Sequence, residues 1–186
     1  MDTGEEIVIA YLKYIKGCDF IQSNLYTPDI QGEIDVVGID INNKKIYVCE
    51  VAIHLTTGLY YVDPKTNISN NVYKLVDKFS KDIEYANKYF PEYEKTIMLW
   101  SPIVKNQKKG AKQNQLNDVL EVKKIIREKY DIELLTVINN HFMACLNELR
   151  EYAIKDTKDN KSPIIRFLQI EEYLKKHIKK LESHLI

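Results

Sequence analysis

The spacing of apolar residues along the chain divides it into helical and extended segments. Helices are predicted where apolar residues recur every three or four positions, at 3–16, 70–90, 115–130, 140–154 and 163–183. Strands are predicted where short runs rich in β-branched and aromatic residues lie between turn residues, at 20–26, 33–41, 45–55, 96–104 and 134–138.

The order of these elements predicts the fold class. Three strands in succession are expected to pair as a meander, and the later strands alternate with helices. We therefore expect one α/β domain over 1–186, a mixed sheet of about five strands flanked by helices. Its core is expected at about 3–140 and a helical extension at about 140–186. The last helix follows a charged stretch and is expected to fold back on the core, with docking on a partner as the alternative.

Composition narrows the function classes. The chain has 27 basic and 27 acidic residues and a formal net charge of zero, whereas a protein that binds DNA by itself usually carries a basic surplus. Its three cysteines form no CxxC pair, which argues against a disulfide framework or a zinc site and for a reducing compartment. The start of the chain is acidic and no segment has the roughly 20 apolar residues that cross a membrane, so we expect a cytoplasmic protein with no membrane contact.

Two acidic residues interrupt the apolar strands at 33–41 and 45–55. A two-residue turn at Asn42 and Asn43, where asparagine tolerates positive backbone angles, sets a register that places Asp35 directly opposite Glu50. Strand alternation then assigns five residues to one face: Glu33, Asp35, Glu50, Ala52 and His54.

Opposed carboxylates inside apolar strands need a compensating positive charge. Like charges directly opposite each other destabilise a sheet, and burial penalises the charged form of each carboxyl group. Magnesium prefers one or two protein carboxylates together with water and phosphate oxygens, so Asp35 and Glu50 are candidate metal ligands. The alternative is that both carboxylates face solvent or pair with lysines.

The order of elements around these acids resembles the PD-(D/E)xK nucleases. That family has an acidic residue on the second strand of a helix, three-strand, helix and strand core, and (D/E)xK on the third strand. Asp35 in GEIDVVG and Glu50 in CEVAIH match these places, and the resemblance covers roughly 3–104. It implies a restriction-endonuclease-like core and phosphodiester hydrolysis that depends on Mg²⁺, with Mn²⁺ as a substitute. Many members add a glutamate on the first helix, where Glu6 fits better than its neighbour Glu5.

The chain departs from the family pattern at the lysine. Ala52 stands where the motif lysine is expected. One candidate replacement is His54, which lies two residues further along the same face and could orient water or donate a proton. The other is Lys78, which flanks the apolar stripe of the following helix, whereas Lys74 points further outward. A structural histidine and a solvated lysine are the alternative interpretations of these two residues.

The size, the missing lysine and the zero net charge suggest a cutting module that needs a partner. In these respects the chain is similar to the small subunit of heterodimeric type IIS restriction endonucleases, in which a larger subunit recognises the site and nicks one strand. This resemblance implies a type II site-specific deoxyribonuclease subunit that cuts the other strand of double-stranded DNA and is a monomer alone. The alternatives are a resolvase or repair nuclease of the same superfamily, or a nuclease-like binding subunit without catalysis.

Overall fold

The computed structural model describes residues 2–27, 32–59, 61, 70–107 and 114–183. The helices and strands of this part of the chain follow one another as α1 (Thr3–Tyr14), β1 (Phe20–Thr27), β2 (Gly32–Asp40), β3 (Lys45–Val51), α2 (Asn71–Tyr89), β4 (Glu94–Ser101), α3 (Gln115–Tyr130), β5 (Leu135–Ile138), α4 (Asn140–Lys155) and α5 (Pro163–Ser183). The predicted order of elements is therefore confirmed.

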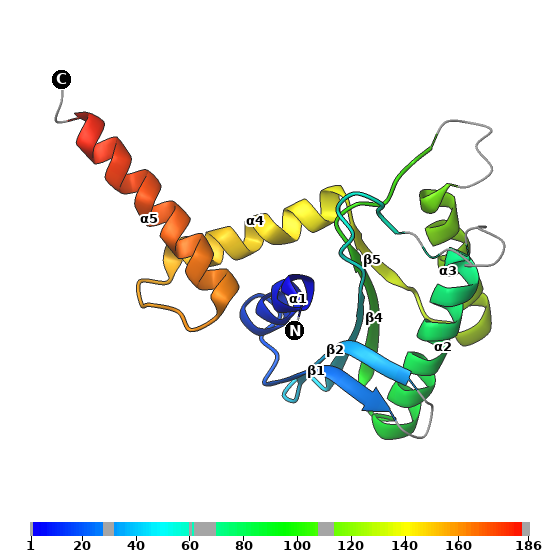
Figure 1. Cartoon of the computed structure of the whole chain (residues 1–186). Helices are drawn as coiled ribbons and strands as arrows, with labels where there is room; N and C mark the ends of the chain where they lie inside the picture. Colours follow the sequence, from blue (N-terminus) through cyan, green and yellow to red (C-terminus); the bar gives the residue numbers. More distant parts are fainter. Residues whose placement is uncertain (1, 28–31, 60, 62–69, 108–113, 184–186) are drawn as a thin grey trace.

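The strands form one sheet in the order β1-β2-β3-β4-β5. The first three pair antiparallel, whereas β3, β4 and β5 run parallel to one another. Parallel neighbours need a crossover connection, and α2 and α3 provide it on one face of the sheet (Figure 1). The expected α/β fold with a mixed, helix-flanked sheet is confirmed.

Each face of the sheet buries its own apolar core. The α2 and α3 side is filled from the helices by Leu75, Phe79, Ile83, Ala86, Val119, Val122 and Ile126. The opposite side is filled from α1, α4 and α5 by Val8, Ala10, Tyr11, Leu12, Phe142, Cys145, Leu149, Ala153, Ile165 and Leu168. Within each helix these buried residues recur every three or four positions, as in an amphipathic helix that packs on a sheet.

The register of β2 and β3 is the expected one, but the turn between them differs from the predicted two-residue turn. Asp40 pairs with Lys45, and the pairing continues in step to Val36 and Cys49. The loop has four residues, and its positive backbone angle lies at Lys44, where φ is 50°, rather than at the two asparagines. The Asp40 carboxylate accepts hydrogen bonds from the Asn43 backbone and side chain at 2.9 and 2.7 Å, which holds the bend.

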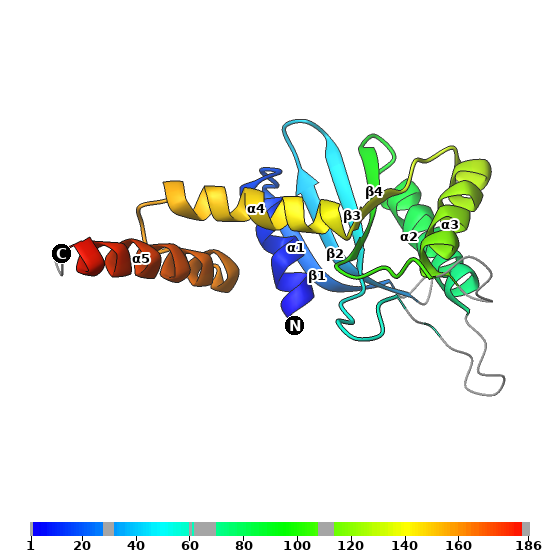
Figure 2. The ribbon, with the colours of Figure 1, turned by 90° about the horizontal axis from the view of Figure 1, so that it is seen from above.

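The last helix packs on the body over its first turns only. Ile165 and Leu168 are buried, and the rest of α5 projects away from the body past the end of α4 (Figure 2). Large apolar residues further along α5 remain exposed, so the expectation that the helix folds back on the core holds for its beginning alone. No helix in the described part of the chain is long and apolar enough to cross a membrane.

The connection between α4 and α5 is fastened by one buried side chain. The Gln169 amide nitrogen donates to the carbonyls of Asp156 and Lys158 at 2.9 and 2.8 Å, and its oxygen accepts from the Asn160 backbone at 3.2 Å. Gln169 is 2% exposed, whereas Lys158 is exposed and Asp156 and Asn160 are half-buried, so the buried amide is the group that these three hydrogen bonds satisfy.

We predict that Gln169→Ala lowers the free energy of unfolding by about 1–3 kcal/mol, because it removes three hydrogen bonds that each contribute about 0.5–1.5 kcal/mol net, with water replacing part of them. Urea denaturation followed by circular dichroism measures this loss. Gln22→Ala, in an exposed position on β1, is the control and is expected to change stability little. Equal stability of the two variants would contradict a fastening role for Gln169.

Candidate active site

Asp35 on β2 and Glu50 on β3 lie on the face of the sheet that α2 covers. Their alternate neighbours Val37 and Val48 belong to the core beneath α2 and α3, which agrees with the face expected from strand alternation. The β2–β3 pairing stops at Val36 and Cys49, one residue before the two acids. There the Asp35 carboxylate accepts the Val51 backbone N–H at 2.7 Å, so the side chain takes a hydrogen bond that a strand partner would otherwise make.

Asp35 also lies at an interruption on its other side. The β1–β2 pairing skips Asn24 and Asp35, and Asn24 has a positive φ of 49°. The Asn24 side chain donates to Glu5 at 3.1 Å, which ties the start of α1 to this irregular position. Local interruptions of this kind re-aim a side chain next to functional sites, and here they release Asp35 from the regular ladder.

Lys78 of α2 joins the two carboxylates. Its ammonium group forms an ion pair with Glu50 Oε2 and lies 3.7 Å from Asp35 Oδ1. Desolvation by itself would lower the pKa of Lys78, but the charges of Glu50 and Asp35 outweigh it and raise that pKa. The lysine therefore remains a cation. Asp35 and Glu50 are thus paired with a lysine, as the alternative to a metal site expected.

Asp82 lies one helical turn beyond Lys78 and faces Glu50. The side chains of Glu50 and Asp82 are 3% and 4% exposed. Burial, followed by the charge of Asp82, raises the pKa of Glu50 well above its ordinary value, and burial likewise raises the pKa of Asp82. Glu50 Oε1 and Asp82 Oδ2 are both buried and receive no hydrogen bond from a donor among the described residues. The two carboxyl groups are close enough to hydrogen-bond to each other when one of them is protonated, and this contact lowers the pKa of Asp82 against the larger effect of burial.

The sequence contains one signal that could have identified Asp82, namely a charged residue within the apolar stripe of α2. Position 82 lies seven residues after Leu75 and three after Phe79, so it belongs to the buried stripe of α2. A charged residue at such a position is rarely fully buried unless it is paired. Its role depends on the neighbouring strand, which only the folded structure supplies.

The structure separates His54 and Glu6 from this cluster. β3 ends at Val51 rather than at 55, so strand alternation no longer governs His54, which lies exposed in the following turn. No hydrogen bond or ion pair within the described residues joins it to the acids. Glu33, expected on the same face, is also exposed.

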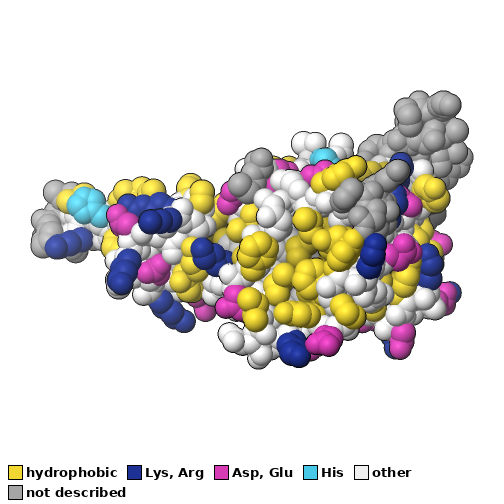
Figure 3. All heavy atoms as spheres, turned by 90° about the horizontal axis from the view of Figure 1, so that it is seen from below, with side chains coloured by type: hydrophobic (Ala, Val, Ile, Leu, Met, Phe, Trp, Pro, Cys, Tyr) yellow, Lys and Arg dark blue, Asp and Glu magenta, His cyan; other side chains and the backbone are white. Residues whose placement is uncertain are grey.

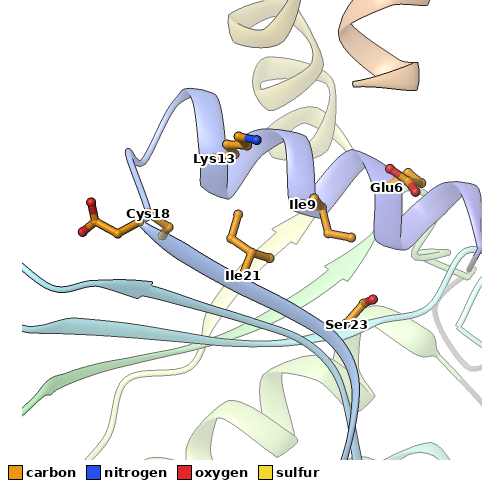
Figure 4. A pocket seen from close by; sticks show the side chains of 7 residues that line it. Glu6, Ile9, Lys13, Cys18, Ile21 and Ser23 are labelled. Atoms are coloured by element: carbon orange, nitrogen blue, oxygen red, sulfur yellow. The ribbon is translucent and has the colours of Figure 1, made fainter. Parts of the chain in front are cut away.

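Glu6 lies on α1, which covers the opposite face of the sheet. It lines a groove of about 310 Å³ between α1 and β1, together with Lys13, Cys18 and Ile21 (Figure 4). Its neighbour Glu5 is the first-helix acid whose charge contributes to raising the pKa of Asp35, after the larger effect of burial.

The acids offer hard oxygen ligands of the type that magnesium binds. Two carboxylates, from Asp35 and Glu50, meet the usual protein share of a magnesium site, which is completed by water and phosphate. The uncompensated oxygens of Glu50 and Asp82 also fit a divalent cation better than they fit a closed apolar core. No group of three His, Cys, Asp or Glu side chains in the described ranges is already arranged around one metal position.

No family model, curated protein or solved structure matches this chain. The assignment of function therefore depends on the residues of this cluster.

We predict that Asp82→Asn stabilises the protein when divalent metal is removed with a chelator. The pKa of Asp82 is higher in the folded protein than in the unfolded chain. The free energy of unfolding of the wild type is therefore highest at low pH, and it falls as the pH rises through the pKa of the folded protein. Asparagine has no such charge and can donate to Glu50. The gain should be small at pH 4 and reach about 1–3 kcal/mol at pH 8, the cost of an unpaired buried polar group.

Thermal unfolding of the wild type and Asp82→Asn across this pH range tests the sign. A variant that is less stable than the wild type at pH 8 would contradict the account of the buried pair.

Proposed function

We propose that the chain is a magnesium-dependent DNA endonuclease subunit that hydrolyses a phosphodiester bond in one strand of double-stranded DNA. One observation carries the proposal: a carboxylate from β2 and a carboxylate from β3 meet on one face, joined by the ammonium group of Lys78. Two acids and a lysine are the functional groups of the PD-(D/E)xK pattern that this chain resembles.

The structure offers a physical reason for the missing motif lysine. Ala52 is 6% exposed, and its backbone N–H donates to the Trp100 carbonyl at 2.8 Å. A lysine at this position would have to bury its side chain under α2. Lys78 reaches the same carboxylates from α2, so we assign the role of the motif lysine to Lys78 rather than to the exposed His54.

The site opens toward solvent at one end. The side chains of Asp35 and Lys78 are 19% and 35% exposed, whereas Glu50 is 3% exposed. Mg²⁺ held by Asp35 and Glu50 would polarise a phosphate and lower the pKa of the attacking water. The Val51 N–H orients Asp35, burial fixes Glu50, and the long side chain of Lys78 can extend its charge to a phosphate oxygen.

Recognition of DNA is assigned to a larger partner subunit. A formal net charge of zero provides little of the basic surface that binds phosphates without help. The exposed part of α5 carries apolar residues on one helical face, each more than two-fifths exposed: Phe167, Ile170, Tyr173, Leu174, Ile178 and Leu181. Hydrophobic side chains are visible along the arm formed by α4 and α5 (Figure 3), and such a surface is typical of a protein interface.

We propose that this α5 stripe docks on the DNA-recognising subunit, as in a type IIS restriction endonuclease, and that the chain alone is a monomer. Lys175 beside the stripe is paired with Glu171 and Glu172 at 2.8 and 3.0 Å, so we expect the complementary surface to be an apolar groove. A cytoplasmic location, where both subunits meet DNA, belongs to the same proposal.

Substitution of the acids tests the catalytic proposal. We expect Asp35→Asn and Glu50→Gln to lower plasmid cleavage in Mg²⁺ by roughly 1,000-fold or more, and Lys78→Met by roughly 100-fold, in the range of single catalytic groups. The assay follows conversion of supercoiled plasmid with the chain alone and with candidate larger subunits. Lys74→Met and His54→Ala are the controls and should retain activity.

Retention of wild-type cleavage by both acid variants would overturn the site. A wild-type chain that binds no Mg²⁺ or Mn²⁺ and cuts under neither condition would instead favour a nuclease-like binding subunit.

The double variant Leu174→Glu, Ile178→Glu tests the α5 stripe. Light scattering should show a monomer for the wild-type chain alone, a complex with the larger subunit, and loss of that complex in the variant because charge in an apolar contact is penalised. Leu120→Glu, an exposed position on α3, is the control. A wild-type dimer that the double variant dissociates would reassign the stripe to self-association.

A further inference from the structure

We infer that Asp82 acts together with Glu50 as a pair of acidic ligands for a divalent cation at the buried end of the cluster. The inference rests on the proposed metal-dependent function and extends it to a residue of α2 that lies outside the PD-(D/E)xK pattern. It assigns to the site a hard divalent cation, Mg²⁺ or Mn²⁺, because carboxylate oxygens are the available ligands.

The two oxygens of Glu50 have different surroundings. Oε2 accepts the ammonium group of Lys78, while Oε1 is buried with no hydrogen-bond partner among the residues described. Asp82 Oδ2 is in the same condition. Buried polar atoms in native proteins nearly always have a partner, so two unpartnered oxygens on facing acids indicate a ligand common to both.

Neither Lys78 nor Lys81 of α2 forms an ion pair with Asp82. Lys78 forms ion pairs with Glu50 and Asp35, and Lys81 pairs with Asp77 at 2.8 Å. The charges of both lysines lower the pKa of Asp82, but burial outweighs them and raises it. Asp82 is 4% exposed, and an ionised group without a direct partner is costly in such a place.

The charge balance of the cluster agrees with one divalent ion. Asp35, Glu50 and Asp82 together supply three negative charges when ionised, and Lys78 supplies one positive charge. The remaining two negative charges are neutralised by one Mg²⁺ or Mn²⁺. A cation that contacts Glu50 Oε1 and Asp82 Oδ2 therefore satisfies both the charge and the two unpartnered atoms.

The competing explanation is that Glu50 and Asp82 share a proton and that Asp82 never contacts a metal. In that case Asp82→Asn would leave the affinity for divalent ions unchanged or raise it, because the charge of Asp82 raises the pKa of Glu50 and a carboxyl ligand must be deprotonated to bind a metal. Direct metal binding separates the two explanations, because it does not depend on DNA, on a partner subunit or on turnover.

The experiment is a calorimetric titration of Mn²⁺ into the full chain at pH 8, for the wild type, Asp82→Asn and Asp77→Asn. Asp77 lies on the same helix, but its side chain is 45% exposed and pairs with Lys81, so its substitution is the matched control. We expect Asp82→Asn to weaken Mn²⁺ binding at least tenfold and Asp77→Asn to leave it within twofold. Asp82→Ser provides a smaller side chain should the asparagine variant fold poorly.

The outcomes separate this inference from the function on which it rests. Equal Mn²⁺ affinity of folded Asp82→Asn and wild type would overturn the role of Asp82 and leave a site of Asp35 and Glu50. Absence of Mn²⁺ binding in the wild type would overturn the metal-dependent function itself. Weakened binding in Asp82→Asn alone, with a native circular dichroism spectrum, supports Asp82 as a ligand.

Discussion

The ion pair between Lys78 and the buried Glu50 is the interaction on which the rest of the site depends. Glu50 is 3% exposed, and the loss of water around a buried carboxylate disfavours its charged form. A nearby cation offsets this cost, because opposite charges attract each other more strongly in the protein interior than in water. α2 must therefore pack against the sheet in the one position that brings Lys78 to β3. The apolar stripe of α2 supplies that packing, and the charged residues on its edge determine what chemistry the packed face can perform.

Two irregularities around Asp35 shape the other half of the site. The β2 strand loses its regular pairing with both neighbours at this residue, and the carboxylate is fixed instead by the Val51 N–H. Asp35 consequently lies nearer to solvent than Glu50, and the cluster has a buried end at Glu50 and Asp82 and an open end at Asp35 and Lys78. A substrate that approaches from the open end would meet groups already held in place, as preorganised sites require.

The two faces of the sheet differ in the kind of residue that they carry. The α2 face contains every charged group of the candidate site, whereas α1 and α4 close the other face over an apolar core. Because the beginning of α5 is anchored to this second core and the rest projects from it (Figure 2), a partner bound along α5 would not cover the site. The open end of the cluster, at Asp35 and Lys78, would therefore stay accessible beside such a partner.

The sequence by itself determined the fold class, the register of β2 and β3, and the shared face of Asp35 and Glu50. These follow from periods of two and 3.6 residues and from a short turn, which are local properties. The tertiary structure brought Lys78, and not His54, to the two carboxylates, because the distance from a helix to a strand is not encoded in either element's own pattern. It also ended β3 at Val51, placed Asp82 against Glu50, and separated the packed beginning of α5 from its exposed end, since each of these depends on contacts between segments far apart in the chain.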